Sequence, residues 1–271
     1  LHTMSESTAE LNYESAPDAA TGQKVIRLAI SAGHGLLANG GETYRVEETM
    51  RHIVEAYAGS DGEAFALPSY LSLTLYDKDG IAHTVSNRVR NRKIDLEIVN
   101  RINAVSRQIT SSKPPLDEAC AMINRAIEER KLADYLRLFA GVLIGFSFTL
   151  LFGADLYGGL IAALASLLGV AINLFLERHG TNAIFSTTIA AMVMTLTVIV
   201  CIKLGYTGSS ESIISGALMN LVPGIAFTVG IRDLVESDYL SGLARLAEAV
   251  LVAVAIAVGS GSAFYIASIF S

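Results

Sequence analysis

The sequence predicts an α-helical polytopic membrane protein with five transmembrane helices and an N-terminal cytoplasmic α+β domain, which combines helices with a β-hairpin. Charge is divided unequally, because residues 1–133 hold 15 of the 20 Lys and Arg and 18 of the 26 Asp and Glu. The remaining half contains five uncharged runs of 17 to 23 residues, and about 20 residues of helix cross a hydrocarbon core. We therefore expect three parts, namely a disordered tail at 1–22, an α+β domain at 23–133 and a transmembrane domain at 134–271.

The composition excludes several classes of function. The net charge of −6 divides equally between the two halves, so neither half carries the basic surface that a nucleic-acid partner requires. Cys120 and Cys201 fall in different predicted domains, and their number and spacing predict neither a disulfide framework nor a metal site. The N-terminal residues are polar and acidic, which is not the pattern of a signal peptide. We expect no metal and no cofactor.

The first half alternates between helical and strand periods. Residues 1–22 are rich in Ser, Thr, Ala and acidic residues and lack an apolar period, which is typical of disorder. Helices are predicted near 24–38 and 42–57. Leu71, Leu73 and Leu75 then alternate with more polar residues, and a turn at 77–80 precedes a returning strand at 81–89, which predicts a β-hairpin. Two amphipathic helices follow, near 98–109 and 116–127.

The second half supplies the predicted spans, at about 135–154, 156–177, 181–203, 212–231 and 239–270. Basic residues near the span ends favour an N-terminal domain on the cytoplasmic side of the inner (plasma) membrane. An odd number of spans then places the C-terminus outside. The chain has no Trp, so we expect tyrosines to lie at the membrane interfaces.

Arg245 and Glu248 are charged residues inside the fifth predicted span. They are three residues apart and therefore share a helix face. Charges at membrane depth usually face a bundle interior or a water-filled cavity. We expect Arg245 to bind a substrate carboxylate and Glu248 to bind an ammonium group or a coupling proton. The alternative is a pair that only anchors the helix near the interface.

The fourth and second predicted spans hold further candidates for substrate binding. Pro223 and Gly224 predict a broken helix, and such breaks expose backbone groups that can hold ions or carboxylates. Asn220 lies one turn before this break, and Asn173 is a polar residue in the second span. Polar residues of spans also bond between helices as packing contacts, which is the reading we favour for the Ser and Thr residues at 186–188.

Arg232, Asp233 and Asp238 belong to the charged link before the fifth span. We expect a structural role, with Asp238 capping the span, and a gate that breaks and remakes charge pairs is the alternative. The soluble domain offers His34, Glu42, Arg45 and Glu47 as notable polar residues, but no nucleophile–base or phosphate-binding motif. We therefore expect no catalytic residues and no enzyme activity. We expect the soluble domain to have a regulatory or gating role for the membrane domain.

Five segments together resemble the threonine/serine exporter family: residues 35–47 (GLLANGGETYRVE), 90–96 (RNRKIDL), 223–224 (PG), 230–234 (GIRDL) and 241–245 (SGLAR). The resemblance extends over 24–271. Because the chain ends after the fifth predicted span, it resembles the larger subunit of the family's two-subunit form. Members of that form are linked to export of amino acids or of dicarboxylates such as succinate. The resemblance also implies a second, smaller membrane subunit as partner.

These observations predict a gradient-driven exporter of small carboxylate metabolites, such as threonine, serine or succinate. With five spans, we expect it to act as a homo- or hetero-oligomer or with the small membrane subunit. Two alternatives stay open. One is a membrane-anchored, hydrolase-like enzyme whose chemistry lies in residues 24–133, and the other is an accessory or regulatory subunit of a transporter.

Overall fold

The computed structural model describes residues 17–59, 62–90, 92–128 and 133–269. The chain divides into two compact units. Unit 1 comprises Leu1–Glu129 together with Thr228–Arg245, and unit 2 comprises Arg130–Phe227 together with Leu246–Ser271. Most of the predicted tail, residues 1–16, lies outside the described residues. The last part of that predicted tail is helical, because the first helix already begins at Ala19.

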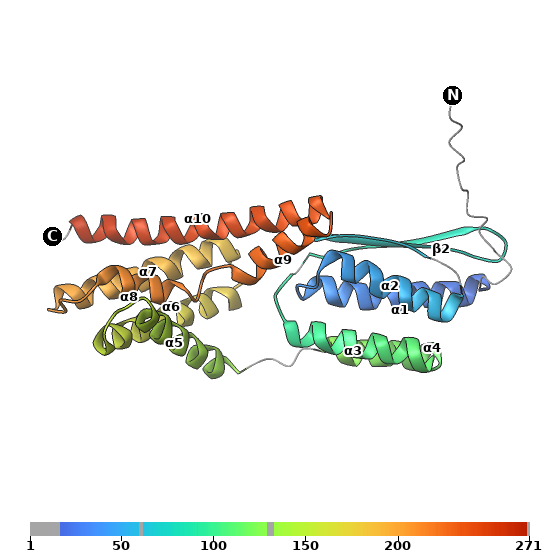
Figure 1. The fold of residues 1–271 in the computed structure, drawn as a ribbon, viewed down its shortest axis with the longest axis horizontal. Helices are drawn as coiled ribbons and strands as arrows, with labels where there is room; N and C mark the ends of the chain where they lie inside the picture. The colour runs from blue at the N-terminus through green and yellow to red at the C-terminus, as the bar shows by residue number, and fades with distance from the viewer. Residues whose placement is uncertain (1–16, 60–61, 91, 129–132, 270–271) are drawn as a thin grey trace, which may run out of the picture. The chain divides into compact units, whose positions relative to one another are not determined.

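The described residues in the N-terminal part of unit 1 form four helices and a three-stranded sheet (Figure 1). Their bounds are α1 Ala19–Ala38, α2 Thr43–Ala58, β1 Glu63–Leu67, β2 Tyr70–Tyr76, β3 Ala82–Arg88, α3 Leu96–Ser112 and α4 Leu116–Ile127. Helix α1 is central, because it contacts α2, α3, α4 and the sheet. Its apolar residues on several faces, including Val25, Ile26, Leu28 and Leu36, are almost fully buried.

The strands form an antiparallel sheet in the order β1-β2-β3. Leu71, Leu73 and Leu75 of β2 are buried while the residues between them are partly exposed, which confirms the predicted alternation and the β2–β3 hairpin. Strand β1 is an additional strand that the sequence did not predict. Its sequence EAFAL contains no β-branched residue, and it is held by pairing with β2 and by a hydrogen bond from Ala66 N to Glu47 Oε1 of α2 (2.7 Å).

Unit 2 is helical in its described residues (Figure 1). It comprises α5 Asp134–Leu151, α6 Leu156–Arg178, α7 Ala183–Lys203 and α8 Ser210–Leu218, with parts of α9 Gly224–Val235 and α10 Tyr239–Ile269. Helix α8 packs against α5, α6 and α7. Small residues permit close packing: a Cβ atom added to Gly216 would lie 2.5 Å from the Thr149 backbone nitrogen, and one added to Gly145 would overlap Ser166.

Four of the described helices are long and apolar enough to cross a membrane: α5, α6, α7 and α10. The fourth predicted span, at 212–231, is not one helix but two short ones, α8 and α9, of 9 and 12 residues. Pro223 has no N–H for a helical hydrogen bond, and α8 ends at Leu218 while α9 begins at Gly224, which confirms the predicted break. A count of five spans is therefore not confirmed by helix length.

The predicted charged link is also shorter than expected. Helix α9 continues to Val235, so Arg232 and Asp233 are helical residues rather than members of a link. The connection to α10 contains only Glu236, Ser237 and Asp238, and Ser237 adopts a positive φ of 70°. This tight turn returns the chain beside α9.

Candidate functional site

The N-terminus of α2 follows a sharp turn after α1. Gly40 has a φ of 90°, a value that favours glycine, and Gly41 N donates to Leu36 O (2.8 Å). A Cβ atom on Gly41 would lie 2.8 Å from the same oxygen, so a side chain does not fit there without movement. Glu42 is the N-cap residue of α2, but its carboxylate makes no capping hydrogen bond to the helix backbone. The first backbone N–H groups of α2 and the Glu42 carboxylate are therefore available to other partners.

The turn between α9 and α10 supplies those partners from the same unit. Asp238 N donates to Asp233 O (2.8 Å), and Gly242 N donates to Asp238 O (2.9 Å) at the start of α10. The two helices approach closely here, because a Cβ atom on Gly242 would lie 2.8 Å from Gly230 O and 2.6 Å from Leu234 Cγ. This close approach places α9 and the first turns of α10 side by side, with Asp233 near Arg245.

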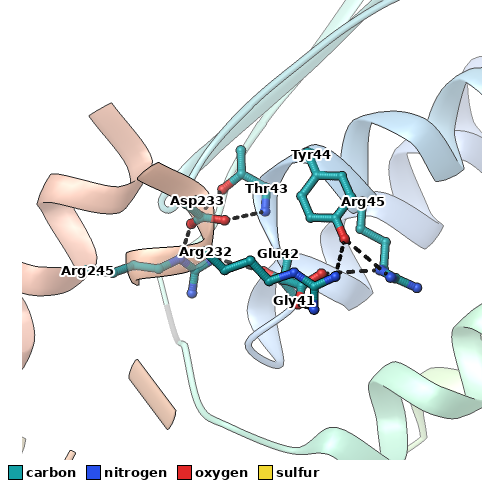
Figure 2. Close-up of polar contacts among 8 residues, drawn as sticks. All are labelled: Gly41, Glu42, Thr43, Tyr44, Arg45, Arg232, Asp233 and Arg245. Carbon is teal, nitrogen blue, oxygen red and sulfur yellow. Dashed lines mark hydrogen bonds and ion pairs between the residues drawn. The ribbon is translucent and has the colours of Figure 1, made fainter. Parts of the chain in front are cut away.

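Figure 2 shows the resulting group of polar residues, which we call the α2–α9 cluster. Its members come from the start of α2 and from α9 and α10: Gly41, Glu42, Thr43, Tyr44, Arg45, Arg232, Asp233 and Arg245. All eight belong to unit 1.

The inner part of the cluster is a buried ion pair. Arg245 Nε donates to Asp233 Oδ2 (2.9 Å), and Arg245 Nη2 donates to Gly41 O (2.7 Å; Figure 2). Asp233 is 0% exposed and Arg245 is 8% exposed. Ion pairs buried to this degree are costly to break by removing one partner, because the remaining charge stays desolvated.

Asp233 also binds the N-terminus of α2. Thr43 donates two hydrogen bonds to Asp233, one from its backbone N to Oδ1 and one from its hydroxyl to Oδ2, and each has a length of 3.4 Å. A carboxylate at this position interacts favourably with the positive end of the helix dipole. Asp233 of α9 therefore acts as a cap for α2 from 190 residues away in the sequence.

The outer part of the cluster is more exposed. Arg232 Nη1 lies 2.6 Å from Glu42 Oε1, and Arg232 Nη2 donates to the Tyr44 hydroxyl (2.8 Å; Figure 2). Arg45 approaches the same two residues from α2, with Nε 3.3 Å from Glu42 Oε2 and Nη2 3.3 Å from the Tyr44 hydroxyl. Both guanidinium groups also lie over the Tyr44 ring, 5.8 Å and 5.6 Å from its centroid. Two cations thus share one carboxylate and one phenol.

Two further carboxylates of unit 1 are perturbed by burial. Asp238 is the residue before α10, where a cap was predicted, and its Oδ2 atom is buried with no hydrogen-bond partner among the described residues. Burial, followed by the charge of Glu236, raises the pKa of Asp238. Burial also raises the pKa of Glu47, and the charge of Asp238 adds to that effect. These groups carry their negative charge at a free-energy cost.

The remaining predicted site residues lie outside the cluster. Glu248 is an exposed residue one turn beyond Arg245 on α10. Asn220 lies at the α8–α9 break. Its amide donates to Gly141 O, Ser166 Oγ and Ala217 O, each at a distance of 3.1 Å. These bonds tie the break to α5 and α6. Pro223 and Gly224 form the end of the break and the start of α9.

Asn173 takes part in a chain of polar contacts in unit 2. Its amide donates to Glu177 Oε1 (2.8 Å), and its carbonyl oxygen accepts from Ser186 of α7 (2.8 Å). Glu177 is in turn 3.4 Å from Arg137 of α5. These polar contacts connect α5, α6 and α7, as polar residues commonly do between packed helices.

The structure brings together three of the predicted residues, Arg232, Asp233 and Arg245, and adds partners that sequence reasoning did not assign. Gly41, Thr43 and Tyr44 are these partners. They lie beside Glu42 and Arg45, two of the notable polar residues of the sequence, in the segment GGETYR. The sequence feature that could have grouped these residues is that GGETYR, GIRDL and SGLAR all combine glycine with charged residues.

The cluster offers charged groups that can recognise a carboxylate. The arginines always carry their charge, and their planar guanidinium groups match the geometry of a carboxylate. Among the described residues, no group of three His, Cys, Asp or Glu side chains could hold a metal ion.

Four apolar helices of membrane length and a compact α+β unit define a multi-pass membrane protein. Residues 27–267 match the family described as "Putative threonine/serine exporter". The chain belongs to this family, which is a family of membrane exporters.

Two curated proteins are similar to the chain. It is 22% identical over 239 residues to the "Probable threonine/serine exporter" of Mycobacterium tuberculosis, over 88% of this chain and 45% of that protein. It is 24% identical over 239 residues to the "Probable succinate transporter subunit YjjP" of Klebsiella aerogenes, over 87% of this chain and 91% of that protein. The chain thus spans about half the length of the mycobacterial relative. No solved structure matches it.

Proposed function

We propose that this protein is a gradient-driven exporter of small carboxylate metabolites and that the α2–α9 cluster is its gate. Candidate substrates are amino acids such as threonine and serine, which the name of the mycobacterial relative contains, and dicarboxylates such as succinate, which the name of the Klebsiella relative contains. The proposal places the protein in the inner (plasma) membrane, with the N-terminal domain cytoplasmic, the C-terminus outside and five spans, in which α8 and α9 together form the fourth.

The observation that supports the gate most directly is the buried pair of Arg245 and Asp233 bound to Thr43. Moving α9 and α10 together away from α2 would break the hydrogen bonds from Thr43 to Asp233 and from Arg245 to the Gly41 carbonyl, so these buried polar groups would lose partners. A substrate carboxylate at Arg245 would take the place of the Gly41 carbonyl and offset part of that cost. Arg232 would release Glu42 in the same step, and Asp238 would hold the turn. The substrate itself would thus favour opening.

The path through unit 2 would use the other candidate residues. The break at Pro223 and Gly224, tied down by Asn220, would offer backbone groups to a carboxylate. Asn173 would supply a polar contact at the end of α6, and Glu248 would carry the coupling proton or bind a substrate ammonium group. A second, small membrane subunit or further copies of the chain would complete the path.

Export assays test the gate. Cells that lack their own exporters and produce this protein with a candidate small subunit should lower their internal threonine, serine or succinate. Arg245→Met should abolish this effect, whereas Arg88→Gln, at an exposed residue of β3, should leave it intact. Equal export by Arg245→Met and the unchanged protein would refute the role of Arg245.

Proton coupling needs its own measurement. Glu248→Gln in reconstituted vesicles should export with little dependence on an imposed pH gradient. If Glu248→Gln keeps the full pH dependence, the coupling proton is carried elsewhere.

An accessory role is the second candidate, because the name of the Klebsiella relative calls that protein a transporter subunit. In this case the chain would regulate a pore formed by its partner. Vesicles containing the partner alone would then show flux, and adding this chain would change only the rate.

A further inference from the structure

A polar cleft lies on unit 1 between α2 and α3, with a volume of about 200 Å³. This volume is below the roughly 300–1,000 Å³ of pockets for drug-sized ligands, so the cleft suits a small ligand. Every residue that lines it is polar or charged: Arg45, Glu48, Thr49, His52, Asn103, Ser106, Arg107 and Thr110.

The cleft is suited to an anion. Arg45, which is also paired with Glu42, and Arg107 bring two permanent positive charges from α2 and α3, and Glu48 supplies the one carboxylate of the lining. The hydroxyls of Ser106 and Thr110 donate to carbonyls of their own helix, at distances of 3.0 Å and 3.1 Å. Guanidinium groups bind carboxylates through two parallel hydrogen bonds, and a pair of them matches an acid with more than one oxygen-bearing group.

Arg45 belongs both to this cleft and to the α2–α9 cluster. It shares Glu42 and Tyr44 with Arg232, and one nitrogen of each guanidinium group lies near the Tyr44 hydroxyl, at 3.3 Å for Arg45 and 2.8 Å for Arg232. Like charges repel, and a bound anion beside Arg45 would weaken the repulsion. Arg232 would then hold Glu42 more strongly.

We propose that the α2–α3 cleft binds a short-chain organic carboxylate and that this binding stabilises the closed α2–α9 cluster. The site differs from the substrate path, because its walls lie in α2 and α3. Its effect on export rests on the proposed function, whereas the binding itself does not. The carboxylate would regulate the gate from the soluble unit.

Calorimetric titration of the purified full-length protein in detergent, without a gradient, tests the binding. Succinate is the probe, inorganic phosphate is the comparison, and ionic strength is held constant. Arg107→Gln should weaken succinate binding about tenfold or more, and Arg107→Lys should lie between, because it keeps the charge and loses the planar fork. The matched control is Arg125→Gln, an exposed arginine of α4 outside the cleft.

The coupling has a reciprocal test. If the anion strengthens the Arg232–Glu42 contact, then Arg232→Gln must lower succinate affinity by the same factor. Equal affinities for Arg107→Gln and the unchanged protein would overturn the site, whatever the export assay gives. Tighter binding of phosphate than of succinate would overturn the carboxylate assignment, and an unchanged affinity in Arg232→Gln would overturn the coupling. If the unchanged protein binds succinate through Arg107 but exports none of the candidate substrates, only the proposed function is refuted.

Discussion

The carboxylate of Asp233 is fully buried and accepts hydrogen bonds from Arg245 and from Thr43. It neutralises a guanidinium, and it completes the N-terminus of a helix distant in sequence. Because Asp233 satisfies two structural requirements at once, its removal should affect both α2 and α10.

A double-mutant cycle should measure the coupling between Asp233 and Arg245. Asp233→Ala leaves the buried guanidinium without its carboxylate and should destabilise the protein by about 3–5 kcal/mol. Combining it with Arg245→Met should restore part of that loss, giving a coupling energy above about 1 kcal/mol in denaturant unfolding of the purified protein. Strictly additive effects would mean that the two side chains do not depend on each other.

The acidic residues predict a definite pH dependence. Burial raises the pKa of Asp238, so its protonated form is favoured in the folded protein. The stability it contributes is present below its unfolded pKa and is lost as the pH rises through its folded pKa. Asp238→Asn should therefore be more stable than the unchanged protein at about pH 8 and should show a smaller dependence on pH between about 4 and 7. Thermal unfolding across this range measures both effects, and a steeper pH dependence in the variant would contradict the prediction.

At the scale of elements, the α9–α10 hairpin orients the cluster through backbone packing. A Cβ atom added to Gly242 would lie 2.8 Å from the Gly230 carbonyl oxygen, so the two helices approach closely there, and only three residues, 236–238, connect them. Asp233 and Arg245 project from neighbouring helices whose separation is set by this contact. The geometry of the ion pair therefore depends on a residue that has no side chain.

Substitution of Gly242 should show this dependence. A Cβ atom there meets Gly230 O at 2.8 Å, so Gly242→Ala should push the helices apart, lower the unfolding temperature and impair export. Gly261→Ala on the same helix is the matched control, because nothing lies within 4 Å of its added Cβ atom and alanine favours helix formation by about 1 kcal/mol. The prediction fails if both variants are equally stable.

At the scale of the whole molecule, few residues of the candidate spans are buried within the chain. In an 18-residue apolar window of each span, between 17% and 33% is buried. Exposed large apolar residues occur along all four helices, among them Phe139, Leu160, Phe185 and Phe264. Lipid would cover such apolar surfaces, and so would the second subunit that the proposed function requires.

Co-purification should distinguish these two explanations. The chain produced with its proposed small subunit should elute as a complex, and its mass, measured by light scattering with the detergent subtracted, should exceed the 28.8 kDa of one chain. Export should rise with the amount of complex. A single 28.8 kDa species that exports at the full rate alone would refute both the oligomer and the partner.

The sequence by itself determined the features that depend on local patterns. The period-two leucines of β2 predicted the hairpin, and long uncharged runs predicted α5, α6, α7 and α10. Pro223 predicted the break between α8 and α9, because proline removes a helical hydrogen bond wherever it stands. In each case neighbouring residues contain the information, since burial and backbone geometry repeat along the element.

Only the tertiary structure decided which charges meet. Arg245 was interpreted from the sequence as a substrate ligand or a membrane anchor, yet in the fold it holds Asp233 and the carbonyl of Gly41. Thr43 and Asp233 are 190 residues apart, and no local period connects them. Strand β1 was missed for a similar reason, because its place depends on β2 and on Glu47 rather than on its own residues. An ion pair forms where packing brings two side chains together, and packing is a property of the folded chain.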